Sequence, residues 1–200
     1  MLDAVTSTLV FGLSALREAS DRGQSFEYRL FWGHRARRDG ALSDTCFSQW
    51  WPCAFTLEGV SYSSAEQYMM AEKARLFGDA EIRAQILATP EPTLQKQLGR
   101  QVHHYDEATW AYNRFEVVTI GNIAKFGQDP RLRAYLLATG NAVLVEASPT
   151  DSVWGIGLAA EHPDATTPGA WRGENLLGFA LMRARMVLAG LSPAETSAPR

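Results

Sequence analysis

The fold of this chain is decided by residues 63–77, which read Ser63-Ser64-Ala65-Glu66-Gln67-Tyr68-Met69-Met70-Ala71-Glu72-Lys73-Ala74-Arg75-Leu76-Phe77. The segment predicts an amphipathic helix with 3.6 residues per turn. One stripe of this helix joins four apolar side chains to two opposite charges, namely Met69, Met70, Leu76, Phe77, Glu66 and Lys73. A carboxylate and an ammonium that turn toward a core lose water and must be paired, neutralised or used in chemistry. The helix is therefore the first candidate for a functional site.

Each of the two charges also has an ordinary structural explanation. Glu66 follows Ser63 by three residues, which is the spacing of a capping box at the start of a helix. Ser64 and Gln67 have the same spacing one residue later, and their pairing would leave Glu66 free. The ammonium of Lys73 could reach solvent past the edge of the core, as a lone lysine usually does. Both explanations stay open at the level of sequence.

Length and composition favour a soluble globular protein of one domain. A chain of 200 residues with 46% hydrophobic and 20% charged residues can bury an ordinary core. The net charge of −3 argues against binding of nucleic-acid backbones by bulk electrostatics. No apolar run approaches the roughly 20 residues that cross a bilayer, and the first residues lack the basic start of a secretory signal. We expect a cytoplasmic protein that does not enter membranes.

The cysteines and histidines do not predict a metal site. Only Cys46 and Cys53 occur, with six residues between them, and they lack the repeated Cys and His spacing of a structural zinc site. Two free thiols are expected, and a disulfide is the alternative. The four histidines show no metal-binding spacing, and no nucleophile elbow is present, so neither a zinc hydrolase nor a Ser/His hydrolase is predicted.

Before the central helix, the pattern predicts a helical N-terminal extension over residues 1–26 that lies at the periphery. A strand is expected over residues 28–32, followed by a basic loop over 33–40 that is either solvated or in contact with a phosphate. Residues 55–62 alternate around Glu58-Gly59, which predicts a hairpin that leads into the central helix.

After the central helix, capping residues and prolines predict five further helices. Asp79, Asp106 and Asp129 stand where helix N-caps are expected, and Pro92 begins another short helix. The last helix follows Gly173-Glu174-Asn175, and Asn175 could be its N-cap. Residues 191–200 are expected to be a flexible tail.

The second informative stretch is the most strand-like run, residues 142–146, with the loop that follows it. We expect this strand to join the hairpin in one small sheet. In the loop, Gly155 and Gly157 would let backbone amides approach a ligand, Trp154 offers a stacking face and Asp151 an acceptor or base. A lone G-x-G is more often a tight turn than a site, but here it coincides with a strand end, a tryptophan and an acid.

Taken in order, these pieces resemble the NADAR family, also called YbiA-like proteins. The resemblance spans residues 30–188, and several motifs in the right order are far more specific than one. The matching motifs are Leu42-Ser43, Phe47-Ser48-Gln49-Trp50-Trp51-Pro52, residues 62–74, Leu98-Gly99-Arg100, Lys125-Phe126, Thr139-Gly140, Val145-Glu146, Asp151-Ser152-Val153-Trp154-Gly155-Ile156-Gly157 and residues 173–178. The chain departs from the family at Asp44, where an Asn is common.

The resemblance implies an α+β fold, predominantly α-helical with a small β-sheet, in one domain over residues 27–190. It also implies hydrolysis of N-glycosidic bonds without a cofactor or metal. One branch of the family cleaves ribosylamino-pyrimidine intermediates of riboflavin synthesis, and another removes ADP-ribose from modified guanine, including guanine in ADP-ribosylated DNA. The expected catalytic residues are Glu66, Lys73 and Asp151. The expected substrate-binding residues are Ser43, Asp44, Trp110, Arg114, Lys125, Trp154, Gly155, Gly157 and Asn175.

A hypothesis from another class is a catalytically silent module that binds NAD or ADP-ribose. Such a module would need Trp154, the glycine turn and nearby cations, but not charges on the apolar stripe of a helix. The positions of Glu66 and Lys73 therefore favour an enzyme. The sequence does not fix the base, the need for a phosphate or the oligomeric state.

Overall fold

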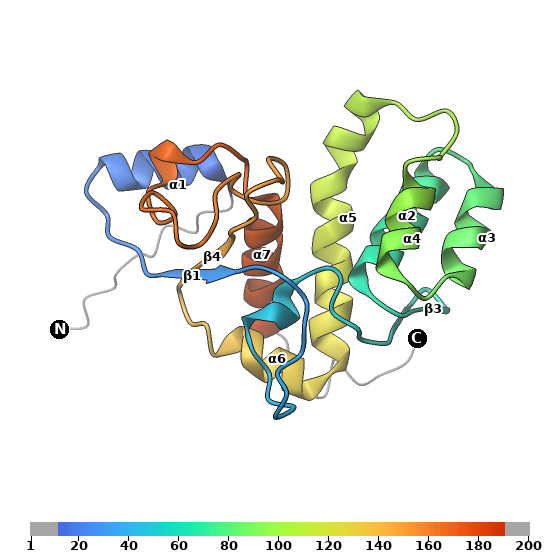
Figure 1. Ribbon diagram of the computed structural model, residues 1–200, viewed down its shortest axis with the longest axis horizontal. Coiled ribbons are helices and arrows are strands. Elements are labelled where there is room, and N and C mark those ends of the chain that lie inside the picture. The colour runs from blue at the N-terminus through green and yellow to red at the C-terminus, as the bar shows by residue number, and fades with distance from the viewer. Residues whose placement is uncertain (1–11, 191–200) are drawn as a thin grey trace.

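The computed structural model describes residues 12–190 of the chain. The expected extension and tail fall partly or wholly on residues 1–11 and 191–200, which lie outside the described residues. Within residues 12–190, the predicted α+β fold, which is mainly helical, is confirmed (Figure 1). The helices are α1 (Leu13–Asp21), α2 (Ala65–Leu76), α3 (Ala80–Ala88), α4 (Pro92–Gly99), α5 (Glu107–Gln128), α6 (Pro130–Leu137) and α7 (Leu176–Gly190), with the short 3-10 turns η1 (Asp44–Phe47) and η2 (Pro168–Ala170).

Helix α2 begins with the pairing that leaves Glu66 free. The Oγ atom of Ser64 accepts a hydrogen bond from the amide of Gln67, and the Oε1 atom of Gln67 accepts one from the amide of Ser63. These bonds satisfy two of the donors that a helix start leaves open. Glu66 therefore has no capping role.

The first two turns of α2 are buried on every side. All residues from 65 to 71 are buried, because α3, α4 and α5 pack around the helix. The one-sided stripe predicted from the sequence was therefore wrong for this half of α2. It holds better for the second half, where Lys73 is only half-buried.

The strands form two separate pairs instead of one sheet. β2 (Phe55–Leu57) and β3 (Val60–Tyr62) form the predicted hairpin. β4 (Val143–Glu146) does not join it, as was expected, but runs parallel to β1 (Tyr28–Phe31), with Glu146 opposite Phe31. The reason is that its residues 143–145 are at most 1% exposed, and a strand buried on both faces needs cover that the hairpin does not give. Helix α7 supplies this cover.

Helix α5 stands between the two halves of the molecule. It contacts α7 on one side and α2 on the other, so the group of α2, α3 and α4 lies across α5 from the β1–β4 pair (Figure 1). The end of β4 and the start of α2 are nevertheless close, because the charge of Glu66 acts on Glu146.

Helix α1 is part of the packed structure and not a detached arm. Leu16 is fully buried, and the guanidinium of Arg17 donates to the carbonyls of Pro168 and Trp171 in the segment around η2. The division of the chain at residue 26 stays a prediction. Among residues 12–190, no helix is both long and apolar enough to span a bilayer.

Candidate active site

Glu66 lies in the first turn of α2 and is almost completely buried, with 3% of its surface exposed. Its amide donates to the carbonyl of Gln49 (2.9 Å), and its carboxylate bonds the side chain of Trp50. The Oε1 atom of Glu66 is buried without any hydrogen-bond partner. Burial raises the pKa of Glu66 to about 7. A carboxylate held at this cost and left unsatisfied is typical of a functional site rather than a structural one.

Two more carboxylates meet Glu66 at the end of β4. Glu146 is the last residue of that strand, and Asp151 lies in the loop that follows. Burial raises the pKa of Glu146 to about 8, and the charges of Asp151 and Glu66 add to this shift. The Oε2 atom of Glu146 also lacks a partner, although the residue keeps some exposed surface. Asp151 is therefore close enough to act on both glutamates, and Glu66 is close enough to act on Glu146.

One positive charge near these acids is Lys96, an exposed residue of α4. Its charge lowers the pKa of both Glu66 and Glu146. The Nζ atom lies 5.8 Å from the centre of the Trp50 ring, within cation–π range. Lys96 and Trp50 therefore lie close to each other, and both act on Glu66.

The loop from Asp151 to Gly157 is held by its own hydrogen bonds. The Oδ1 atom of Asp151 accepts from the amides of Val153 (2.9 Å) and Trp154 (2.8 Å), so Asp151 orients the loop and Trp154 with it. Gly155 has no room for a side chain, because a Cβ atom would lie 2.8 Å from the carbonyl oxygen of Glu146.

Gly157 adopts a φ of +68°, and its amide donates to the carbonyl of Asp151. This amide is occupied within the loop, which differs from the expected approach of free amides to a ligand. The two glycines serve close packing and a tight turn.

Asn175 positions the end of β4. It is fully buried with a φ of +54°, its Oδ1 atom accepts from the amide of Glu146 (2.9 Å), and its Nδ2 atom donates to the carbonyl of Leu144 (2.9 Å). Both ends of the side-chain amide therefore bond the backbone of β4. Its expected contact with a substrate stays a prediction.

Lys73 is not part of the carboxylate cluster. Its Nζ atom donates to the carbonyl of Gly99 (2.8 Å) and lies 4.1 Å from the ring centre of Tyr105 and 5.9 Å from that of Trp110. Burial lowers the pKa of Lys73, and Glu66 is not among the groups that influence it. Within residues 12–190, no carboxylate forms an ion pair with this lysine.

Arg114 and Trp110 lie on the part of α5 that faces Lys73. The guanidinium of Arg114 approaches two carboxylates, Glu107 at 3.7 Å and Glu174 at 3.3 Å. It therefore joins α5 to the segment before α7. Trp110 is 7% exposed, so it is mainly a core residue with one edge near the amine of Lys73.

Ser43 and Asp44 hold the turn η1 and contact none of the three acids. The Oγ atom of Ser43 pairs with the hydroxyl of Thr45 (2.8 Å). The carboxylate of Asp44 accepts from Arg29 (2.6 Å) and from the hydroxyl of Tyr135 (3.0 Å). An Asp at this position is explained by Arg29, because a charged acceptor bonds a guanidinium more strongly than the amide of an Asn.

Lys125, which was expected to bind substrate at the edge of a site, is fully buried. Its ammonium donates to the carbonyls of Cys46 (2.7 Å) and Ser48 (2.8 Å), which fixes the chain just before Trp50. Burial lowers its pKa to about 8. Cys46 and Cys53 are both free thiols, as expected.

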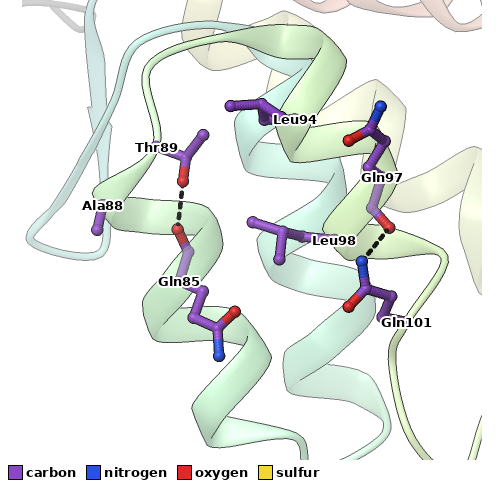
Figure 2. A pocket seen from close by; sticks show the side chains of 7 residues that line it. All are labelled: Gln85, Ala88, Thr89, Leu94, Gln97, Leu98 and Gln101. Carbon is purple, nitrogen blue, oxygen red and sulfur yellow. Dashed lines mark hydrogen bonds between the residues drawn. The ribbon is translucent and has the colours of Figure 1, made fainter.

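A separate cavity of about 410 Å³ lies between α3 and α4 (Figure 2). It is lined by Gln85, Ala88, Thr89, Leu94, Gln97, Leu98 and Gln101. None of these residues carries a charge or belongs to the carboxylate cluster. Chemistry therefore points to the cluster and not to this cavity. In the described part of the chain, no group of three or more His, Cys, Asp or Glu side chains is arranged to hold a metal ion.

Comparison with known proteins identifies the family of this chain. The family model described as the NADAR domain matches residues 30–189. The chain belongs to the NADAR family. The N-glycosidase R617 of Acanthamoeba polyphaga mimivirus is 46% identical over 144 residues, which cover 70% of this chain and 85% of R617.

Two bacterial proteins extend the comparison. N-glycosidase YbiA of Escherichia coli is 32% identical over 139 residues, covering 70% of this NADAR chain and 77% of YbiA. Its NMR structure superimposes with a TM-score of 0.64 at 28% identity, over 83% of this chain and 88% of YbiA. A riboflavin biosynthesis protein of Vibrio vulnificus is 30% identical over 146 residues, which cover 73% of this chain but only 36% of that protein.

The structure adds three residues to the site that sequence reasoning missed. Glu146 reads as the polar end of a strand, Lys96 as an exposed residue of a short helix and Trp50 as part of an aromatic loop. The available signal for Glu146 was its place directly after the most apolar strand, where a carboxylate is brought to the strand's carboxyl end.

Proposed function

We propose that this N-glycosidase of the NADAR family hydrolyses the bond between ribose and a nitrogen base, with ribosylamino-pyrimidine intermediates of riboflavin synthesis as substrates. The observation that carries this proposal is the buried Oε1 atom of Glu66, which has no partner inside the protein. A ribosyl centre that develops positive charge, or a water that attacks it, would provide that partner.

Asp151 and Trp154 complete the proposed arrangement. Asp151 contributes a second negative charge next to Glu66 and holds the backbone of Trp154. Trp154 keeps exposed surface on which a flat base can stack. Cleavage of the ribosyl bond would therefore take place between α2 and the loop that follows β4.

Lys73 has a distinct proposed role. An amine can attack the opened aldehyde form of ribose and form a Schiff base, for which it must be neutral. The lowered pKa of Lys73 and its lack of an ion pair support this role. To react, the amine would have to leave the carbonyl of Gly99. If it stays there, Lys73 only holds a substrate oxygen.

A specific observation favours a second candidate substrate, ADP-ribosylated guanine in DNA or as a free nucleotide. The basic loop begins directly after β1, beside the end of β4. Arg35 and Arg38 are exposed there, and neither forms an ion pair with a described residue. Such arginines can contact a pyrophosphate that extends from the ribose. A silent NAD or ADP-ribose binding module remains the alternative of another class.

One activity screen tests these proposals together. The purified chain is incubated with ribosylamino-pyrimidine, with and without its 5′-phosphate, and with ADP-ribosylated guanosine, and release of the free base is followed by chromatography. Cleavage of the pyrimidine substrate by the parent and not by Glu66→Gln is expected. Tight binding of ADP-ribose without any cleavage would instead support the silent binding module. The cytoplasmic location expected from the sequence stays a prediction.

A further inference from the structure

Glu146 is a buried acid to which the proposed function gives no role. It ends β4 with one carboxylate oxygen buried and unpartnered, directly beside two other acids. We infer that Glu146 gives its proton to the departing base, while Glu66 is the carboxylate that stays ionised. This inference rests on the proposed N-glycosidase function and deepens it.

The position of Glu146 suits a proton donor. The residue keeps some exposed surface, so a ligand can reach it, whereas Glu66 is nearly closed off. Its backbone is fixed from two sides, because its amide donates to Asn175 and its carbonyl accepts from the amide of Ile156 (2.9 Å). The backbone from which the acid extends therefore keeps its place in the site.

The charges around the two acids divide their roles. The groups that act on Glu146 are Asp151 in the same loop, Glu66 on α2 and Lys96 on α4, and the two like charges outrank the lysine. For Glu66, Lys96 is the strongest electrostatic influence and Trp50 adds a hydrogen bond, both of which favour the ionised form. When one proton is shared between two nearby carboxylates, it therefore rests on Glu146.

The reaction balances with these two residues and one water molecule. The bond between ribose C1′ and the base nitrogen breaks, and its electron pair stays on the nitrogen, which takes the proton of Glu146. The water forms a bond to C1′ and loses a proton to Glu66. The products are ribose and the free base, and a proton passes from Glu66 back to Glu146 through solvent.

The test compares leaving groups that differ in their need for a proton. A base such as guanine or an aminopyrimidine departs as an anion unless it is protonated, whereas the cationic base of nicotinamide riboside departs neutral. Glu146→Gln keeps the size of a protonated glutamate but cannot give up a proton. We expect this variant to lose about 10²-fold or more in kcat on the bases that need a proton, and less than about threefold on nicotinamide riboside.

Matched variants separate this inference from the proposed function. Glu66→Gln is expected to lose activity on both kinds of substrate, and Glu81→Gln, the same change on an exposed turn of α3, on neither. Equal losses of Glu146→Gln on both kinds of substrate would overturn the role of Glu146 while leaving the function intact. Failure of the parent to cleave any ribosylated base would overturn the function.

A titration provides a readout that does not depend on activity. In protein labelled with ¹³C at glutamate carboxyl groups, the resonance that disappears in Glu146→Gln is expected to report a protonated acid at pH 7. The resonance lost in Glu66→Gln should titrate at lower pH than that of Glu146. The reverse order of the two acids would overturn the assignment of the proton donor.

Discussion

The two ends of helix α2 carry opposite charges on one stripe but treat them differently. At the first turn, Glu66 is almost fully buried, has an oxygen without a partner and lies among two other acids. Two turns later, Lys73 is half-buried and rests against a carbonyl and two aromatic rings. The spacing of seven residues places their backbones about 10 Å apart along the axis.

A shared helical face therefore does not imply a shared environment. The carboxylate of Glu66 is ready to react where it lies, because one of its oxygens has no partner in the protein. The amine of Lys73 is bonded to a carbonyl and has to be released before it can attack. The loss of Glu66 should therefore reduce activity more than the loss of Lys73.

The largest effect is expected for Glu66→Gln. The variant keeps the shape of the side chain and removes its charge, so the fold should persist while kcat falls by about 10² to 10⁴. Steady-state kinetics on the substrate found in the activity screen, together with circular dichroism, measure both properties. A folded variant with full activity would show that the unsatisfied oxygen has no chemical use.

Lys73→Arg is expected to reduce kcat by about 10², near the lower end of what a positioned reactive group contributes. Arginine keeps a positive charge but cannot form a Schiff base. Borohydride reduction during turnover should leave a ribosyl adduct on Lys73 of the parent, detectable by mass spectrometry. Absence of the adduct together with appreciable activity of Lys73→Arg would leave Lys73 with only a holding role.

The two ends should also differ in how they link stability to pH. Because the folded chain raises the pKa of Glu66 from 4.5 to about 7, it binds more protons than the unfolded chain in this interval. The free energy of unfolding should therefore fall as the pH rises from 4.5 toward 7, by roughly 3 kcal/mol for this group. Glu146 acts in the same direction up to a pH of about 8.

Lys73 has the opposite sign, since its lowered pKa makes stability rise as the pH approaches 10.5. Urea unfolding between pH 5 and 8 measures the slope. The slope of the unfolding free energy against pH should become flatter in Glu66→Gln and stay unchanged in Lys73→Met. An unchanged slope in Glu66→Gln would mean that Glu66 ionises as easily as an exposed glutamate.

The smallest effect on the enzyme is expected for substitution of Trp154. This substitution tests whether the base lies near Glu66, at the start of α2. Because Asp151 holds Trp154 near Glu66, Trp154→Ala should weaken substrate binding by about 1 to 3 kcal/mol and Trp154→Phe by less. Calorimetric titration of the inactive Glu66→Gln background measures the affinity. Equal affinity of both variants and the parent would place the base elsewhere.

Sequence alone could locate Glu66 and Asp151 but not the group to which they belong. Local patterns predicted α2 and the loop after β4, since these depend on neighbouring residues, but they left two possible caps for α2. Glu146 and Lys96 lie 80 and 30 residues from Glu66, and only the pairing of β4 with β1 and the packing of α4 on α2 bring them together. Because β4 was expected to pair with the hairpin, Glu146 was not expected near Glu66.

The buried side chains gave the other differences. Asn175 and Lys125 were expected to bind substrate, and the capping of a helix was the alternative for Asn175. In the structure each satisfies backbone groups of a neighbouring segment, as buried polar residues usually must. The sequence contains no local sign of which backbone groups will need them.

The two hydrogen bonds from Asn175 to the backbone of β4 matter for protein engineering. Gly178, one turn into α7, leaves no room for a Cβ atom, which would lie 2.0 Å from the Leu144 carbonyl and within 2.7 Å of the Asn175 amide. A designer who transplants the acidic loop onto another scaffold must therefore carry over this asparagine, this glycine and the first turn of a helix beneath the strand. Without them, the backbone of Glu146 would lose the hydrogen bond that fixes it on the new scaffold.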